Sequence, residues 1–359
     1  MKVSFVDLGA EQLEIGDAIR DAMNAVVENT QFILGPAVEG FELAFARFCG
    51  TDHCVGVSNG TEALKLVLEA LEIGPGDEVI VPANTFVATA LAVCAVGARP
   101  KLVDCDPESH LIDTGAIEAA LSDKTRVLLP VHLYGRMVDL DALSGLGLPI
   151  VEDAAQAHGA ERGGLRAGAG GIAGCFSFYP SKNLGAYGDG GAVVTSDSGL
   201  ADTLRSLRNY GQVAKYDHQR IGYNARLDAL QAAVLHVKLS ELDAGNRRRR
   251  AAAAFYSQHL AVELPRPGTE GVFHLYTIRV RDRDRLRKQL DEVGIETGVH
   301  YPIPLHLQGC FRDLGYSKGD FPNAERAAEE VLALPMYPQI SEEQLAYVVE
   351  HVNRLAEAP

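Results

Sequence analysis

The chain of 359 residues carries 33 basic and 48 acidic side chains, which give it a formal net charge of −15. Such a negative field repels phosphate backbones and argues against nucleic acid as a partner. The N-terminus has no apolar signal core, and no run approaches the roughly 18 apolar residues that span a membrane. We therefore expect a cytoplasmic protein, and its length predicts a large domain with a smaller one.

The predicted elements begin with two helical segments in residues 1–50, joined by the Gly35-Pro36 turn. This arm is expected to pack on the main domain or on a partner subunit. Between residues 55 and 200, short apolar runs alternate with helical patterns, which indicates an α/β fold with a mostly parallel central sheet flanked by helices. The predicted strands are Val79–Pro82, Lys101–Asp104, Val127–His132, Ile150–Asp153, Cys175–Tyr179 and Ala192–Thr195. The predicted helices are Thr61–Leu71, Thr85–Val96 and Gly115–Leu121.

The pattern changes after Asn224 to a long helix and then to a smaller α+β segment. The elements expected there are a helix over Arg226–Leu260, a strand over Val272–Val280, a helix over Arg283–Val293, a stiff loop over His300–Pro304 and a helix over Ser341–Leu355. We therefore predict a large α/β domain, including the N-terminal arm, over residues 1–240. A small C-terminal α+β domain would span residues 241–359.

Lys182 lies in the region with the densest polar pattern, Phe176–Gly191. A strand is predicted to end at Tyr179, Pro180 stops it, and the lysine follows in a loop with four glycines. Sheets of this class bind ligands beyond the carboxyl ends of their strands. In a partly desolvated pocket the pKa of a lysine falls, which makes it a nucleophile for Schiff-base chemistry. Taken alone, the pattern fits a surface lysine in a flexible loop equally well.

Asp153 ends the neighbouring apolar strand and is expected to point into the same crevice as Lys182. The cofactor pyridoxal 5′-phosphate (PLP) needs such a carboxylate, because the acid keeps the pyridine nitrogen protonated and the ring an effective electron sink. An acid that caps the next helix is the alternative interpretation. Gln156, three residues further on, is placed to bond the oxygen on the cofactor ring.

The turn after Val57 predicts an anion site. Free N–H groups of Gly60 and Thr61 at the start of a helix attract phosphate, although the same residues also make an ordinary helix cap. Ser177 offers a further hydroxyl. Phe86, at the end of another strand, could lie flat on a cofactor ring, whereas a core phenylalanine is the alternative.

Three other patterns carry less functional weight. Gly168–Gly171 looks like a dinucleotide loop, but it follows no first strand–turn–helix unit and no ribose-binding acid comes after it, so we expect no nicotinamide cofactor. The basic run Arg247–Arg250 lies in a helical pattern and indicates a solvated face or an inter-subunit ion-pair site. The six cysteines form no C-x-x-C pair, so buried reduced thiols and no metal site are expected.

Taken together, these motifs resemble the DegT/DnrJ/StrS family of sugar aminotransferases, within the fold-type I PLP enzymes. The matching blocks are Ser58–Thr61, Asn84–Phe86, Glu152–Gln156, Ser177–Gly191, Gly222–Arg226 and His300–His306. The resemblance runs essentially end to end. It implies a PLP-binding domain over residues 1–240 and a homodimer with shared active sites.

The resemblance also implies a role for each matched residue. Lys182 would carry the cofactor covalently, and Asp153 would pair with the pyridine nitrogen as the second catalytic residue. Asn224 would reach the cofactor phosphate of the neighbouring subunit. The complete implied cofactor site is Gly60, Thr61, Phe86, Asp153, Gln156, Ser177, Lys182 and Asn224.

The loop over Gly298–Gln308 resembles the form found in members that aminate C3 of a 3-keto sugar, whereas members that act at C4 usually carry a different loop. The residues that would line the sugar and nucleotide pocket are Tyr187, His300, Tyr301 and His306. Two prolines and several aromatic rings also suit a purely structural connector.

The implied reaction is PLP-dependent transamination of a nucleotide-linked, dTDP-bearing 3-keto-6-deoxyhexose, with L-glutamate as the amino donor. The alternatives are amination at C4, a PLP-dependent dehydratase or lyase, and a regulatory protein of the same fold. Relatives that dehydrate carry histidine in place of the lysine, so the presence of Lys182 disfavours that branch.

Overall fold

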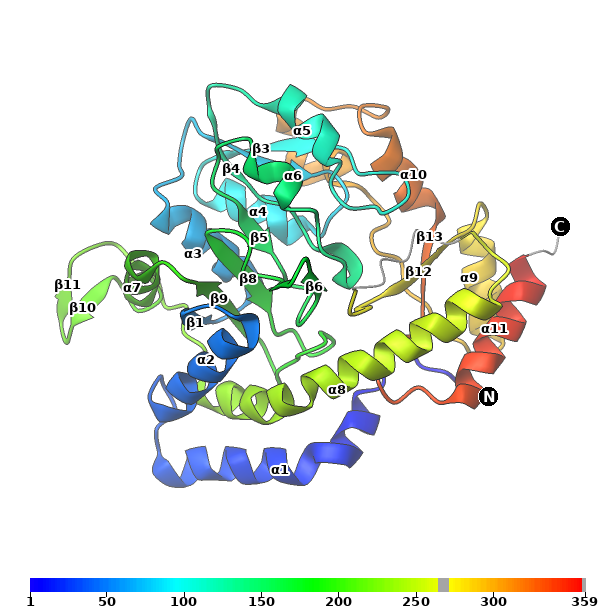
Figure 1. The fold of residues 1–359 in the computed structure, drawn as a ribbon, viewed down its shortest axis with the longest axis horizontal. Coiled ribbons are helices and arrows are strands. Elements are labelled where there is room, and N and C mark those ends of the chain that lie inside the picture. The colour runs from blue at the N-terminus through cyan, green and yellow to red at the C-terminus, as the bar shows by residue number, and fades with distance from the viewer. Residues whose placement is uncertain (264–270, 357–359) are drawn as a thin grey trace.

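The computed structural model describes residues 1–263 and 271–356, and its centre is a mixed sheet (Figure 1). The strands of this central layer are β1 (His53–Val57), β2 (Glu78–Pro82), β3 (Arg99–Val103), β4 (Thr125–Leu128), β5 (Val151–Asp153), β8 (Ala173–Ser177) and β9 (Gly191–Thr195). Hydrogen bonding joins them in two groups, β3-β2-β4 and β5-β8-β9-β1. The parallel bridges Leu128↔Ile150 and Val131↔Asp153 connect the two groups edge to edge.

The direction of the strands confirms the predicted mostly parallel sheet. β2 runs parallel to β3 and β4, and β5 runs parallel to β8. β9 is antiparallel to both β1 and β8. The carboxyl ends of β2, β5 and β8 therefore meet at one edge, where the sequence places its chemical groups.

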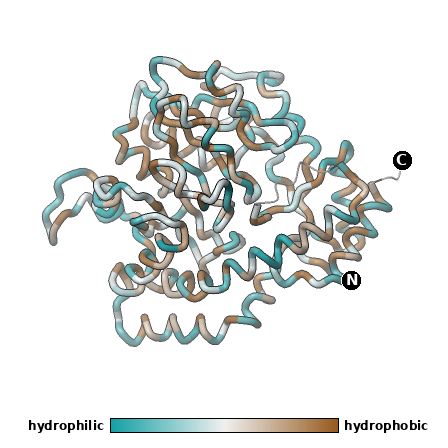
Figure 2. The backbone as a smooth tube through the Cα atoms, viewed as in Figure 1, coloured by the Kyte–Doolittle hydropathy of each residue, from teal (hydrophilic) through white to brown (hydrophobic). Residues whose placement is uncertain are grey.

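Helices cover the sheet, and the hydrophobic stretches gather in the central layer (Figure 2). The α-helices are α1 (Leu8–Asn29), α2 (Pro36–Cys49), α3 (Gly60–Ala70), α4 (Val87–Ala95), α5 (Thr114–Ala120), α6 (Asp141–Ser144), α7 (Ser198–Leu207), α8 (Ala229–His259), α9 (Arg283–Glu292), α10 (Pro322–Glu330) and α11 (Glu342–Ala356). Short 3-10 turns lie at Leu133–Gly135, Leu305–Leu307 and Gly309–Leu314. The predicted N-terminal arm comprises α1 and α2, and both helices pack against α8 (Figure 1).

The C-terminal part pairs β12 (Tyr276–Arg279) with β13 (Val331–Leu334) in an antiparallel ribbon. Small two-stranded ribbons also form from β6 (Glu161–Arg162) with β7 (Leu165–Arg166), and from β10 (Gln212–Ala214) with β11 (Asp217–His218). The predicted domain boundary at residue 240 falls inside α8. The first half of this helix packs in the core of the large layer, while its second half packs with α9 and α11. The division at residue 240 stays a prediction.

Several element ends differ from the prediction, because pairing partners set them. β8 stops at Ser177 instead of Tyr179, since its last partner in β9 is Gly191. β4 stops at Leu128, and only an isolated bridge at Val131 continues toward β5. β12 begins at Tyr276 rather than Val272, because β13 covers no more of it. Local propensity cannot show where a partner strand ends.

The basic run on α8 divides in two: Arg247 and Arg248 are exposed, as predicted for a solvated face, whereas Arg249 is buried and Arg250 is partly buried. Arg248 forms an ion pair with Glu14 of α1 at 2.9 Å. Arg249 is buried and donates to the carbonyl of Met336 at 2.9 Å, and Arg250 donates to the carbonyl of Gly271 at 3.0 Å. These contacts connect α8 to α1 and to the C-terminal part of the chain.

The cysteines are free, and four of them are buried as predicted, while Cys94 and Cys310 are exposed. Within residues 1–263 and 271–356, no cluster of histidine, cysteine or acidic side chains is arranged to hold a metal ion. No helix in the same ranges is long and apolar enough to cross a bilayer.

Candidate active site

A cavity of about 560 Å³ opens at the carboxyl end of the sheet. Its lining comes from the start of α3, the turn before α4, the end of β5, the loop after β8 and the segments around His274 and His300. The structure brings together nine of the predicted site residues there: Gly60, Thr61, Phe86, Asp153, Gln156, Ser177, Lys182, His300 and Tyr301.

Lys182 reaches this cavity from a tight loop. Its backbone N–H donates to the carbonyl of Tyr179 at 2.8 Å, and Gly185 packs so closely that a Cβ would lie 2.3 Å from the carbonyl oxygen of Pro180. Burial lowers the pKa of Lys182 to about 8, while the carboxylate of Asp153 opposes this shift. A substantial fraction of the amine is therefore neutral near pH 7–8, as a nucleophile requires.

Asp153 faces the same cavity from the end of β5. Its Oδ2 accepts a hydrogen bond from Thr89 at 2.8 Å, and Oδ1 accepts one from the N–H of Ala155 at 3.2 Å. Thr85 contacts Thr89 at 3.1 Å and extends this chain. Burial raises the pKa of Asp153, whereas Thr89 and Lys182 lower it. A cationic partner in the cavity would therefore stabilise the ionised carboxylate.

Glu152, on the opposite face of β5, explains the glycine loop that resembles a dinucleotide site. Its carboxylate is fully buried and accepts hydrogen bonds from the backbone of Gly168, Gly170 and Gly171 at 2.7–2.8 Å. The Nε2 of His132 donates to it at 2.7 Å. Burial opposes ionisation, but these donors hold the pKa of Glu152 below its usual value. The loop thus binds an internal carboxylate that anchors β5 beside Asp153.

The predicted anion site lies where α3 begins. The side chain of Asn59 caps the helix at Glu62, with a hydrogen bond of 2.9 Å, and so leaves the first N–H groups of Gly60 and Thr61 toward the cavity. The backbone of Gly60 lies so near Ser177 that a Cβ would come within 2.6 Å of the serine Cβ. This close approach gathers backbone donors and a hydroxyl at the positive end of a helix, which suits a phosphate.

Gln156 holds a fixed orientation in the cavity wall. Its Oε1 accepts from the N–H of Tyr134 at 2.7 Å, and its Nε2 donates to the hydroxyl of Tyr301 at 3.0 Å. The second hydrogen on Nε2 is thus available for a ring oxygen. Phe86 is half-exposed above the cavity, with its ring centroid 5.4 Å from that of Tyr301.

Two histidines also line the cavity. Burial lowers the pKa of His300 to about 4, and its ring stacks on Phe5 at 5.8 Å between centroids. His274 was not predicted, and neither was Thr89. The spacing of four residues between Thr85 and Thr89 in the helix predicted from the sequence could have indicated the threonine, whereas His274 gives no local signal.

Three predicted residues do not line this cavity. Asn224 is exposed on the segment before α8. The hydroxyl of Tyr187 bonds Gln12 of α1. His306 is buried, and its Nε2 bonds Glu325 at 2.8 Å. Within one chain, the structure therefore gives Tyr187 and His306 packing partners instead of a place in the cavity.

These residues fit PLP. A lysine of lowered pKa and a buried carboxylate face one cavity, a cradle of N–H groups and a hydroxyl suits the phosphate, and Phe86 offers an aromatic face. This combination, on a mostly parallel sheet flanked by helices, defines a fold-type I PLP-dependent enzyme.

Comparisons with known proteins support the assignment to the PLP-dependent enzymes. Residues 13–353 match the DegT/DnrJ/EryC1/StrS aminotransferase family. A transaminase from Streptomyces venezuelae, named for dTDP-3-amino-3,4,6-trideoxy-α-D-glucose, is 48% identical, over 99% of this chain and 97% of that relative. The protein belongs to the DegT/DnrJ/EryC1/StrS aminotransferase family.

Solved structures of similar proteins agree with the fold and the cofactor. The crystal structure of DesV from S. venezuelae, in complex with a ketimine intermediate, has a TM-score of 0.98 at 48% identity and covers 100% of this chain and 99% of its own. The PLP form of the putative sugar aminotransferase Spr1654 from Streptococcus pneumoniae has a TM-score of 0.90 at 26% identity, over 95% and 96% of the two chains. The protein is a PLP-dependent aminotransferase.

Proposed function

We propose that the protein transfers the amino group of L-glutamate to C3 of a dTDP-linked 3-keto-6-deoxyhexose, with the predicted residues that line the cavity in the roles described for them above. The observation that carries the proposal is that Lys182 and Asp153 line one cavity, which also holds a phosphate cradle. The name of the S. venezuelae relative, which places the amino group on C3, supports the sugar and the position. Amination at C4 is the alternative.

PLP, when bound, supplies a carbonyl that condenses with amines and a ring that withdraws electrons. Asp153 would keep the pyridine nitrogen protonated, and Thr89 holds the carboxylate in place. The Nζ of Lys182 would take a proton from the α-carbon of the donor as a base and deliver it as an acid to the cofactor carbon that carries the amino group. The same amine serves both halves of the reaction, so ping-pong kinetics are expected.

The position of amination can be tested by running the reaction backwards. Purified protein is mixed with 2-oxoglutarate and either dTDP-3-amino or dTDP-4-amino 6-deoxyhexoses, with the UDP sugars as a parallel series, and glutamate is measured. We expect glutamate from 3-amino sugars at a rate at least about tenfold above that from 4-amino sugars, because a misplaced amine loses its alignment with Lys182. Activity on 4-amino sugars alone would overturn the C3 assignment.

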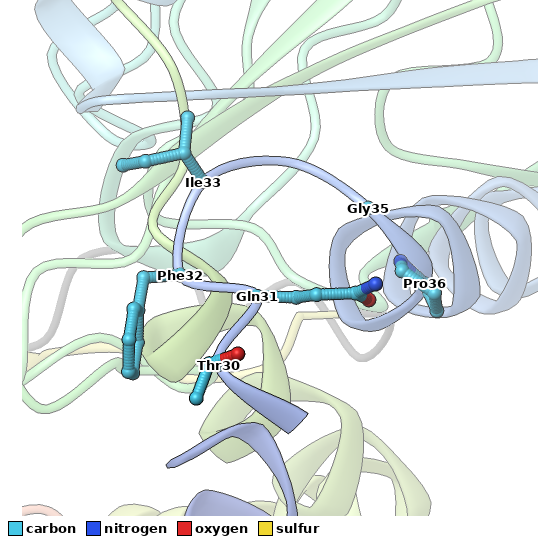
Figure 3. Close-up of a pocket in the computed structure, with 6 residues that line it drawn as sticks. All are labelled: Thr30, Gln31, Phe32, Ile33, Gly35 and Pro36. Atoms are coloured by element: carbon cyan, nitrogen blue, oxygen red, sulfur yellow. The ribbon is translucent and has the colours of Figure 1, made fainter. Parts of the chain in front are cut away.

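We also propose a homodimer with shared sites. The loop between α1 and α2, shown in Figure 3, exposes 45% of Phe32 and 55% of Ile33. Ile33 forms a backbone bridge with Asp228, four residues after Asn224. Exposed apolar side chains of this size indicate an interaction surface. If a second copy of the chain covered this surface, Asn224 of one subunit would approach the cofactor phosphate of the other. The predicted cytoplasmic location remains part of this proposal.

Mixed subunits test the shared site. We expect Lys182→Ala and Asn224→Asp each to be inactive, since the second places a negative charge against phosphate. After the two variants are unfolded and refolded together, one site in each mixed dimer contains both native residues, so activity should return to about a quarter of the wild-type value for random pairing. Mixed dimers without activity, shown to form by affinity tags on each chain, would contradict the shared site.

A further inference from the structure

A chain of side-chain amides lies behind Lys182. Asn246 of α8 donates through Nδ2 to the carbonyl of His158 at 2.8 Å. Asn183, next to the lysine, donates through Nδ2 to Oδ1 of Asn246 and to the carbonyl of Val272, both at 3.0 Å. The chain ends at His274, whose Nδ1 lies 3.2 Å from Oδ1 of Asn183.

The backbone carbonyls fix the direction of every bond in this chain, because a carbonyl only accepts. The carbonyl of Val272 requires the amide nitrogen of Asn183 to face it, since a flipped amide would place oxygen against oxygen. Oδ1 of Asn183 must then face His274 as an acceptor. The Nδ1 of His274 therefore carries the hydrogen, and in a neutral ring the Nε2 holds a lone pair.

His274 is buried and lines the same cavity as Lys182. The hydrogen bonds found among residues 1–263 and 271–356 include the one from Nδ1 of His274 and none to its Nε2. Burial lowers the pKa of His274 well below its usual range, and the charges of Lys182 and Arg249 act in the same direction. His158 and His300 are the other titratable neighbours. The cavity thus contains a neutral histidine with a fixed acceptor.

We propose that His274 is a positioning residue for the catalytic lysine: its Nε2 accepts a hydrogen bond from the Nζ of Lys182 once that amine has left a bound cofactor. The inference rests on the proposed function. Asp153 is committed to the pyridine nitrogen when PLP is bound, so the free amine needs a different acceptor. A lysine amine donates in both its neutral and its charged form, and a neutral acceptor aims it without trapping its proton.

Two substitutions distinguish the roles of the two ring nitrogens of His274. His274→Gln keeps an acceptor where Nε2 lies, and His274→Asn keeps a donor to Asn183 where Nδ1 lies. The reaction with L-glutamate alone is followed as a single turnover by absorbance. We expect about a tenfold loss of rate in His274→Asn and a loss of about twofold or less in His274→Gln, because only the first removes the acceptor.

Three outcomes of these rate measurements overturn the role. Equal losses in the two variants, or a larger loss in His274→Gln, mean that the ring acts only through its structural bond to Asn183. A loss in His274→Asn that occurs only with the keto-sugar and spares the glutamate reaction means that Nε2 binds the sugar instead of the lysine.

A second readout is independent of activity. The ¹⁵N chemical shifts of histidine in the PLP-loaded full chain report which ring nitrogen carries hydrogen, and His274→Gln assigns the signal. We expect hydrogen on Nδ1 and a neutral ring throughout the pH range of activity. Hydrogen on Nε2 overturns the inference. Wild-type protein that fails to convert L-glutamate contradicts the proposed function and leaves this tautomer measurement unaffected, so the two failures are distinguishable.

Discussion

Replacement of Lys182 by alanine is expected to lower turnover by at least about 10³-fold, because the same amine holds the cofactor and moves the proton. The covalent absorbance band that PLP gives with a protein lysine should vanish as well. Added methylamine should restore a small part of the rate, since it supplies a free base to the space that the side chain leaves. Single-turnover absorbance with L-glutamate measures both effects.

Lys318→Ala provides a matched control for this loss. Lys318 is exposed and forms a long surface contact of 4.0 Å with Glu329, so its removal should leave the rate unchanged. Near wild-type turnover in Lys182→Ala would contradict the assignment of the lysine.

Asp153→Asn is expected to lower kcat/KM by about 10²–10³-fold at nearly unchanged stability. The asparagine matches the shape of the acid and keeps an oxygen for Thr89, which bonds Oδ2 at 2.8 Å. It removes the negative charge that holds the pyridine nitrogen protonated, so the ring withdraws electrons less well. Steady-state kinetics and a melting curve separate the chemical effect from misfolding.

A cofactor analogue sharpens this test. N-methylated PLP carries a permanent positive charge on the ring and should recover part of the activity of Asp153→Asn, while it should not rescue Lys182→Ala. The same modest loss of rate in Asp153→Asn and Thr89→Val would contradict a charge-based role, because the second change removes only one hydrogen bond.

The principal site residues could be predicted because each follows the end of a strand. Asp153 ends β5, Lys182 follows β8 and Gly60 follows β1, and the structure brings them to one edge of the sheet. The carboxyl ends of parallel strands meet at one edge of the sheet. The end of each predicted strand is therefore enough to place these residues together. The lengths of several strands needed correction.

The supporting residues could not be predicted, because distant packing decides them. His274 meets Asn183 across 91 positions of the sequence, and Thr89 meets Asp153 across 64. The glycines at 168–171 give the same sequence signal whether they bind a cofactor or the buried Glu152. The resemblance likewise gave no indication that His306 packs against Glu325 within the chain.

Reduction of the PLP-loaded protein with borohydride, followed by peptide mapping, tests the central claim most directly. Borohydride converts a carbon–nitrogen double bond between lysine and cofactor into a stable single bond, and the mass of the labelled peptide identifies the lysine. The site geometry predicts one phosphopyridoxyl group on the peptide that contains Lys182 and none after prior exposure to excess L-glutamate. A label on another lysine, or no label at all, would contradict it.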